Sequence, residues 1–202
     1  MRIPKLNHEI YLIKNGYQVV AGVDEVGRGA WAGPVVASAV ILPKFHRFYL
    51  IRDSKLINRK TREKLARRIR KEAIWAIGRA SVEEIDNLGL HRATLLAFKR
   101  ALFNLDKRPD FILVDAYKIP EIEVEHRPIK KGDMNCASIA AASIVAKVAR
   151  DSLMRRIHLR FRRYYFNRHK GYGTRLHQER LAKYGPCEIH RKSFGPIKRL
   201  IK

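Results

Sequence analysis

Apolar residues along this chain fall into short runs, and these runs predict both strands and helices. Three segments rich in Val and Ile, at 17–24, 34–42 and 74–82, are typical of strands. The short apolar run at 110–115 predicts a fourth strand and is continuous enough to be buried on both faces. The segment 124–130 could form a fifth strand. The order of these segments predicts a sheet in which three neighbouring strands come first.

Helical spacing of apolar positions fills the gaps between the predicted strands. It predicts helices over 58–73, over 82–105 with a break at Gly89, over 136–161 and over 174–184. Strands that alternate with helices exclude a helical bundle and a sandwich, and favour a mixed α/β sheet. The first half of the third helix is dominated by Ala and Ser, which predicts close packing of that helix on the sheet.

Charge changes this picture, because 43 Lys and Arg face only 19 Asp and Glu and give a formal net charge of +24 over 202 residues. Residues 150–202 hold 16 of the cations and three of the acids. Such an excess predicts a nucleic-acid partner, since cations on a polyanion release counterions. An anionic membrane is the alternative, but neither end of the chain has the amphipathic helix that it would need. A hydrophobic content of 46% excludes a disordered polyelectrolyte.

The two cysteines, Cys136 and Cys187, are too far apart for a zinc finger and too few for a disulfide scaffold. The N-terminal segment mixes charges into every turn and is unlike a signal peptide. These features predict a soluble, cytoplasmic protein of one domain. The histidines lack metal-ligand spacing, and we expect them at the surface or on nucleic acid: His91, His126, His158, His177 and His190.

Acidic residues end two of the apolar segments and precede a helix at a third position. Asp24 and Glu25 follow one predicted strand, Asp115 ends another, and Asp133 comes just before a helix. One interpretation is that the chain merely returns to solvent at these points. The other is a cluster whose mutual repulsion requires cations, for which carboxylate oxygens suit Mg²⁺ or Mn²⁺. In a basic protein, such a cluster fits two-metal cleavage of a phosphodiester.

Two glycine-containing segments and one lysine are candidate substrate contacts. The tripeptide Gly27-Arg28-Gly29 is either a plain turn or a loop that lets the backbone approach a sugar-phosphate. Tyr172, between two glycines, either stacks on a base or sugar or packs in a turn. Lys147 either serves a helix dipole or reaches a phosphate.

These segments together resemble one known family, ribonuclease HII, the type 2 ribonuclease H. The resemblance starts with AGVDEVGRGAWAGP at 21–34 and follows the family order over nearly the whole chain. The further blocks are 53–55 (DSK), 91–101, 113–115, 131–133, 138–151, 170–174, 184–186 and 190–194.

The resemblance implies a ribonuclease H-like mixed five-stranded sheet flanked by helices, with a C-terminal helical extension. It implies a catalytic core over 1–150 and a basic substrate-binding extension over 151–202, within one globular unit. Ribonuclease HIII, a relative with an extra N-terminal domain, fits less well because Asp24 lies near the start. Type 1 ribonucleases H lack the Gly-Arg-Gly block. This chain departs from the family at Ala116 and Tyr117, which follow Asp115 where glycine is usual.

The resemblance further implies an endoribonuclease that cuts the RNA strand of RNA–DNA hybrids and nicks on the 5′ side of single ribonucleotides in duplex DNA. The implied products carry 5′-phosphate and 3′-hydroxyl ends. By motif, two divalent cations would be held by Asp24, Glu25, Asp115 and Asp133, and substrate would be bound by Gly27, Arg28, Gly29, Lys147 and Tyr172. No membrane and no obligate protein partner is expected. A non-catalytic RNA-binding protein of the ribosomal type and a recombinase or integrase remain the alternatives.

Overall fold

The computed structural model describes residues 6–43 and 58–201, so the predicted motif at 53–55 lies outside the described residues. The strands are β1 (Val20–Val26), β2 (Val35–Ile41), β3 (Ile74–Ala80), β4 (Phe111–Asp115) and β5 (Glu125–Ile129). The helices are α1 (Asn7–Lys14), α2 (Arg59–Glu72), α3 (Val82–Phe103), α4 (Gly132–Asn135), α5 (Ala137–Arg160), the 3-10 turn η1 (Arg162–Tyr164), α6 (Phe166–His169), α7 (Arg175–Tyr184) and α8 (Gly195–Lys198).

The five strands form one mixed sheet in the order β3-β2-β1-β4-β5, which confirms the predicted fold class. β1 pairs antiparallel with β2, and β2 with β3, whereas β1–β4 and β4–β5 are parallel. In the parallel pair, Val23 is level with Val114. The residues that follow them, Asp24 and Asp115, therefore lie side by side toward the carboxyl ends of these two neighbouring strands.

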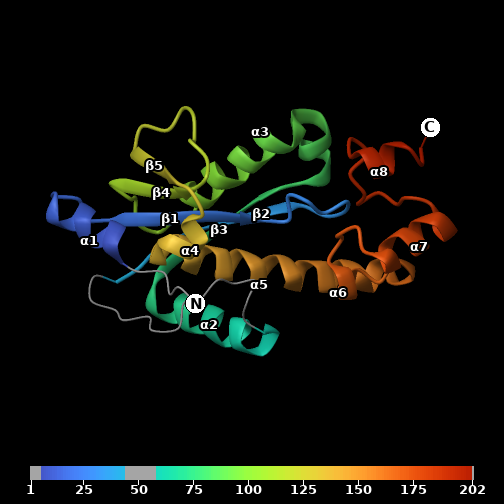
Figure 1. The fold of residues 1–202 in the computed structure, drawn as a ribbon, viewed down its shortest axis with the longest axis horizontal. Coiled ribbons are helices and arrows are strands. Elements are labelled where there is room, and N and C mark those ends of the chain that lie inside the picture. The colour runs from blue at the N-terminus through green and yellow to red at the C-terminus, as the bar shows by residue number, and fades with distance from the viewer. Residues whose placement is uncertain (1–5, 44–57, 202) are drawn as a thin grey trace.

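Helices cover both faces of the sheet, with α3 on one face and α5 and α2 on the other (Figure 1). A capping box formed by Ser81 and Glu84 starts α3. The predicted break at Gly89 is present as a kink with φ 79°. Two buried apolar clusters join the sheet to α3 and to α2 with α5, so each face has a core of its own.

Close contact between α5 and β1 follows from the small residues on both. A Cβ added to Gly22 would overlap the backbone of Ser138 and Ile139, so only glycine fits at this crossing. Ala140 and Ala141 of α5 are also fully buried, in the cluster that includes Val40 of β2. This confirms the predicted close packing, and it brings the polar residues of α5 against the strand that carries Asp24.

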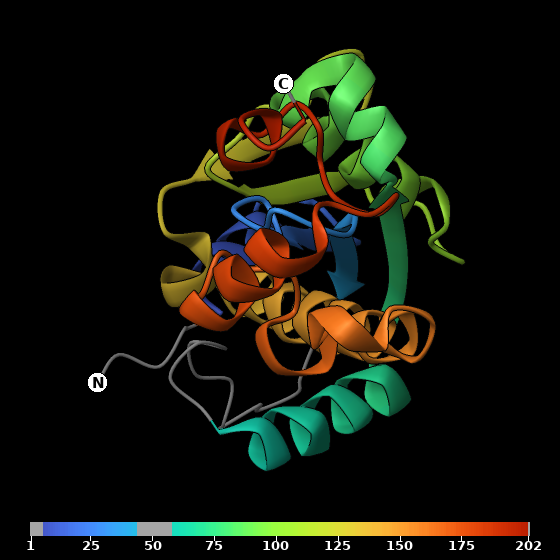
Figure 2. The ribbon, with the colours of Figure 1, turned by 90° about the vertical axis from the view of Figure 1, so that its right-hand side faces the viewer.

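The C-terminal elements α6, α7 and α8 lie together at one end of the sheet (Figures 1 and 2). Two isolated bridges attach them to the loop after β1, between Ala30 and Tyr172 and between Ala32 and His190. The boundary drawn after residue 150 falls inside α5, so one continuous helix links the sheet to these elements. The short helices α1, α4, α6 and α8 have no apolar repeat long enough to predict them.

Candidate active site

Four acidic side chains predicted from the sequence line a single cavity of about 350 Å³. Asp24 and Glu25 come from β1, Asp115 from the end of β4, and Asp133 from α4. Its complete lining is Asp24, Glu25, Val26, Asp115, Asp133, Ser143, Lys147 and Tyr172. The structure thus brings together residues more than a hundred positions apart in the sequence.

Strand register and a short helix position these carboxylates. β1 continues to Val26, so the prediction that the strand ends at Asp24 is wrong, and Asp24 and Glu25 lie within the paired strand. Asp115 Oδ1 accepts a hydrogen bond of 2.7 Å from the backbone N–H of Gly132, which ties the start of α4 to the end of β4. As a result, Asp133 is held in the first turn of α4 beside Asp115, and it is buried.

Asp24 is buried next to two other acidic residues. Only 5% of the residue is exposed. Burial raises its pKa well above the ordinary value, and the neighbouring Glu25 and Asp115 raise it further. Hydrogen bonds from Ser143 and from the backbone N–H of Glu25, the latter 2.7 Å long, oppose this shift only in part. A positive charge placed in the cavity would favour the ionised form of Asp24.

The chemistry of these donors fits a hard divalent cation, because carboxylate oxygens are the ligands that Mg²⁺ and Mn²⁺ prefer. Among residues 6–43 and 58–201, however, no group of three or more His, Cys, Asp or Glu side chains is already arranged to hold a metal ion.

A buried arginine, Arg191, holds the Gly27-Arg28-Gly29 loop in place. Its Nη2 donates to the carbonyl oxygen of Gly27 and its Nη1 to that of Arg28, both at 2.7 Å. Nε and Nη2 also donate to Gly33, at 2.9 and 2.8 Å. Burial, with nearby Arg150 adding to it, lowers the pKa of Arg191 to about 9, so the guanidinium stays charged at neutral pH. The loop is therefore a fixed turn whose carbonyl oxygens point inward.

Within this loop, the arginine side chain contacts protein groups and the second glycine faces outward. The Arg28 guanidinium lies 3.6 Å from Glu25, donates to Thr94 Oγ1 at 3.1 Å, and sits 4.7 Å above the Tyr117 ring. Gly29 is exposed, and a Cβ there would meet nothing within 4 Å. Gly27 thus lies buried at the start of the turn, whereas the backbone of Gly29 is exposed.

A second buried arginine, Arg150, joins this loop to the C-terminal elements. It donates to the carbonyl oxygens of Pro34, Lys170 and Ala32, at 3.0, 3.0 and 3.2 Å. Both Arg150 and Arg191 are fully buried. Arg191 therefore does not position substrate as expected for the cations of 151–202, and Arg150, just before that range, is likewise bonded to backbone carbonyl oxygens. Sequence reasoning missed them because a structural arginine is indistinguishable from a phosphate-binding one in a basic segment.

Tyr172 and Lys147 meet at the rim of the acidic cavity. Lys147 Nζ lies 5.7 Å from the centre of the Tyr172 ring, and the Arg150 guanidinium lies 5.4 Å from it. Lys147 forms an ion pair of 2.8 Å with Asp151 one turn further along α5. It sits in the middle of the helix, so a role in complementing the helix dipole is wrong.

Two buried histidines hold the backbone of Tyr172. His177 Nδ1 donates to the Tyr172 carbonyl oxygen at 3.0 Å, which leaves His177 Nε2 to accept from His190 Nε2 at 3.0 Å. His190 Nδ1 in turn accepts from the backbone N–H of Cys187 at 2.8 Å. Burial lowers the pKa of His177 to about 3 and that of His190 to about 4. The prediction that these histidines lie on the surface is wrong, because both are neutral core residues.

A third histidine completes this support. His169 stacks on His177 with ring centroids 4.3 Å apart and accepts from the backbone N–H of Gly171 at 3.2 Å. Buried imidazoles thus bond the backbone before and after the Tyr172 side chain, at the Gly171 N–H and at the Tyr172 carbonyl oxygen. Spacing in the sequence could not reveal this, since these histidines contact backbone groups and one another instead of a metal.

Comparison with known proteins agrees with this geometry. The family profile described as Ribonuclease HII matches residues 21–196. Ribonuclease HII of Pelotomaculum thermopropionicum is 49% identical over 201 residues, which cover 98% of this chain and 76% of the relative. Ribonuclease HII of Caldicellulosiruptor bescii is 48% identical over 184 residues, which cover 91% of this chain and 89% of the relative.

Solved structures with the same fold also belong to ribonucleases H. The ribonuclease H2 from Pyrococcus horikoshii OT3 superposes with a TM-score of 0.77 at 24% identity, covering 91% of this chain and 97% of that chain. The ribonuclease HII in a complex with PCNA from Archaeoglobus fulgidus superposes with a TM-score of 0.75 at 25% identity, covering 86% and 94%. No helix in the described part of the chain has the length and apolar content to cross a membrane. The profile match, the identity over nearly the whole sequence and the shared fold show that this chain belongs to the ribonuclease HII family and is an endoribonuclease.

Proposed function

We propose that this endoribonuclease nicks duplex DNA on the 5′ side of a single embedded ribonucleotide, in addition to cutting the RNA strand of RNA–DNA hybrids. The products would carry 5′-phosphate and 3′-hydroxyl ends. The observation that carries the proposal is the cavity in which four carboxylates face Lys147 and Tyr172. A cluster of acids inside a protein of net charge +24 has no use in phosphate binding alone.

Asp24, Glu25, Asp115 and Asp133 would hold two divalent cations, Mg²⁺ or Mn²⁺. Bound there, the cations would supply an activated water for in-line attack and stabilisation of charge on the departing 3′ oxygen. The raised pKa of Asp24 supports this role, because a carboxylate crowded by other acids gains most from a cation. Lys147 and the exposed cations of residues 151–202 would orient the phosphate backbone.

Selection of a ribonucleotide depends on its 2′-hydroxyl, which both donates and accepts a hydrogen bond. The carbonyl oxygens of Gly27 and Arg28 are bonded to Arg191, whereas the backbone of Gly29 is exposed and would contact the sugar. Tyr172 is bridged to Ala30, the residue that follows Gly29. Its ring would pack on the next sugar, where a deoxyribose fits and a 2′-hydroxyl crowds the ring.

This proposal is tested by comparing Tyr172→Ala with Tyr172→Phe on two substrates, a duplex with one ribonucleotide and a long RNA–DNA hybrid. Loss of a stacking surface costs about 1–3 kcal/mol, or roughly ten- to hundred-fold in rate. We expect this loss for Tyr172→Ala on the single ribonucleotide and a much smaller loss on the hybrid. Tyr172→Phe keeps the ring and should retain most of both activities.

An equal loss of rate on both substrates would contradict the sensing role and leave Tyr172 as a packing residue. Binding of both variants to the duplex should stay close to that of the unmodified protein, because duplex affinity comes mainly from phosphates. A large loss of binding for Tyr172→Ala would also contradict the proposal.

A further inference from the structure

A second cavity, of about 660 Å³, lies between α2, β3 and α5 and is rich in arginine. We call this cavity the arginine pocket. Its lining includes six arginines, namely Arg59, Arg67, Arg70, Arg79, Arg155 and Arg156. Glu63 is the one acid among the described residues that line it. Most of these arginines come from α2 and β3, outside the basic C-terminal segment.

The charge of this pocket is poorly compensated within the protein. Six guanidinium groups and one carboxylate leave a formal excess of five positive charges around one cavity. Arg59 Nε and Arg155 Nη2 both contact Glu63 Oε1, at 2.9 and 3.6 Å, so a single acid serves two arginines. Mutual repulsion among the cations is relieved when an anion with several charges enters.

Arg70 is held in place at the floor of the pocket. Its guanidinium lies 4.8 Å from the centre of the Trp75 ring, and Trp75 Nε1 donates to the Arg70 carbonyl oxygen at 3.1 Å. Nε of Arg70 is buried and has no hydrogen-bond partner among the described residues. Guanidinium groups bind phosphate oxygens in pairs of parallel hydrogen bonds, so phosphate is the anion that best fits a fixed arginine.

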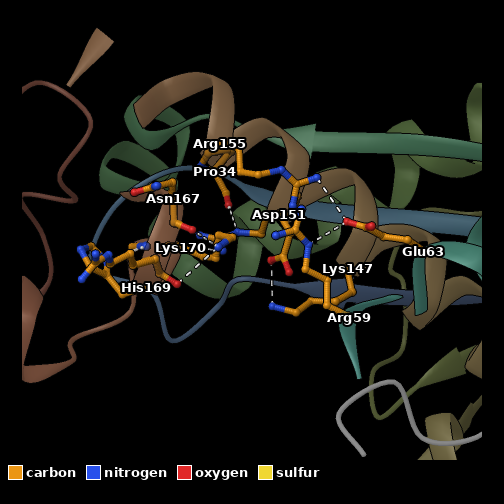
Figure 3. Close-up of polar contacts among 12 residues, drawn as sticks. Pro34, Arg59, Glu63, Lys147, Asp151, Arg155, Asn167, His169 and Lys170 are labelled. Carbon is orange, nitrogen blue, oxygen red and sulfur yellow. Dashed lines mark hydrogen bonds and ion pairs between the residues drawn. The ribbon is translucent and has the colours of Figure 1, made fainter. Parts of the chain in front are cut away.

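Two separate ion pairs lie along α5 between the acidic cavity and the arginine pocket (Figure 3). Lys147 at the cavity pairs with Asp151, and Arg155 one turn further along α5 pairs with Glu63 of α2. Residues 147, 151 and 155 lie on one face of α5, because they are spaced by four. The rise along α5 from residue 147 to residue 155 is about 12 Å at 1.5 Å per residue, the length of roughly three to four base pairs along a duplex.

We propose that the arginine pocket binds backbone phosphates of the duplex about three to four base pairs from the cut. This inference deepens the proposed function, because it rests on a duplex whose cleaved phosphate lies in the acidic cavity. The pocket would extend the footprint of the protein on one side of the ribonucleotide only. It would add affinity without taking part in the chemistry.

Binding of an all-DNA duplex, which cannot be cut, tests the pocket separately from catalysis. We would measure fluorescence anisotropy across a salt series for the triple variant Arg67→Gln, Arg70→Gln, Arg79→Gln. Each lost phosphate contact should flatten the slope of log affinity against log salt by about 0.9. The matched control, Lys107→Gln, Arg108→Gln, Arg127→Gln, removes three exposed cations from the other edge of the sheet and its approach, and should keep the slope.

If loss of the Arg70–Trp75 contact unfolds the triple variant, the double variant Arg67→Gln, Arg79→Gln keeps that contact and should still flatten the slope. Equal slopes for the pocket variants and the control would overturn the proposal. This outcome would leave the cleavage function untouched, whereas failure to cut any ribonucleotide would overturn the proposed function without changing these slopes.

Substrate length and a competing anion complete the test. We expect a ribonucleotide duplex trimmed to two base pairs on one side of the cut to bind the unmodified protein more weakly, and trimming to have little effect on the triple variant. A protein insensitive to trimming on either side contradicts the inference. Calorimetric titration with pyrophosphate identifies the source of the phosphate. Tight, pocket-dependent pyrophosphate binding without any change in duplex affinity would assign the pocket to a free anion and overturn the proposal.

Discussion

Two glycines of one motif are predicted to respond in opposite ways to the same substitution. Gly27 has φ +98°, and a Cβ there would lie 2.7 Å from Arg150 Cζ. Gly29 does not have a positive φ, and a Cβ there would meet nothing within 4 Å. Gly27→Ala should therefore damage the fold, whereas Gly29→Ala should damage only the approach of substrate.

The structure sets the size of the first effect. Placing alanine in the left-handed region costs about 1–2 kcal/mol. Displacing the Arg150 guanidinium would break one or more of its hydrogen bonds to the carbonyl oxygens of Pro34, Lys170 and Ala32. A hydrogen bond from a charged donor is worth roughly 1.5–3 kcal/mol, so losing one brings the total to about 2.5–5 kcal/mol and losing two to about 4–8 kcal/mol. This is a large part of the stability of a typical domain.

The second effect is the reverse. Gly29→Ala at a compatible backbone position should change the free energy of unfolding by less than about 1 kcal/mol. If the backbone of Gly29 contacts the ribose, however, an added methyl group holds the sugar away. Loss of one hydrogen bond of roughly 1–3 kcal/mol corresponds to a rate about ten- to hundred-fold lower.

The assay pairs urea unfolding with cleavage of a duplex that contains one ribonucleotide. Gly27→Ala should lower the unfolding midpoint strongly. Gly29→Ala should keep the midpoint and lose activity. A fully active Gly29→Ala protein would refute the assignment of this loop to the sugar, and an undisturbed Gly27→Ala midpoint would refute the packing argument.

Three further predictions follow from particular residues. Asp24→Asn should abolish cleavage yet raise the melting temperature in metal-free buffer at neutral pH, because the raised pKa of Asp24 makes its ionised form unfavourable in the fold. The gain in melting temperature should shrink as the pH falls and Asp24 takes up its proton. A melting temperature below that of the unmodified protein would contradict this. Because the pKa values of His177 and His190 are lowered to about 3 and 4, the unfolded chain binds more protons below pH 6.5, and each should cost roughly 2 kcal/mol of stability by pH 5 in urea titrations. Ala116→Gly should stabilise the fold by about 0.5–1 kcal/mol, because Ala116 has φ 60°, and an unchanged unfolding midpoint would contradict this.

The fold was predictable because its elements carry local signals. The Val-rich segments, the apolar repeat over 58–73 and the break at Gly89 each depend on neighbours in the sequence, and each corresponds to an element of the structure. The helix over 136–161 was recognisable from its small residues, and Gly22 explains why they are small. Helices of four residues, such as α4, depend on tertiary hydrogen bonds and left no such pattern.

The site was predictable where the chemistry resides in residue type and not where it resides in packing. The four acids stand out in a basic chain, and the motifs that resemble the family name them directly. Arg150, Arg191 and His177 act through backbone carbonyl oxygens, which have no signature in the sequence. The left-handed conformation of Ala116 likewise becomes visible only in the structure.

The central claim, that the four carboxylates cut a strand at an embedded ribonucleotide with bound cations, is tested most directly by mapping the cut. A duplex labelled at each end and containing one ribonucleotide would be incubated with the protein in Mg²⁺, in Mn²⁺ and in EDTA, with Asp24→Asn as the control. We predict one nick on the 5′ side of the ribonucleotide, with a 5′-phosphate on the downstream product, in Mg²⁺ and in Mn²⁺. We predict no nick in EDTA and none with Asp24→Asn. A nick that persists in EDTA or in Asp24→Asn, or one placed elsewhere in the strand, would contradict this reading of the site.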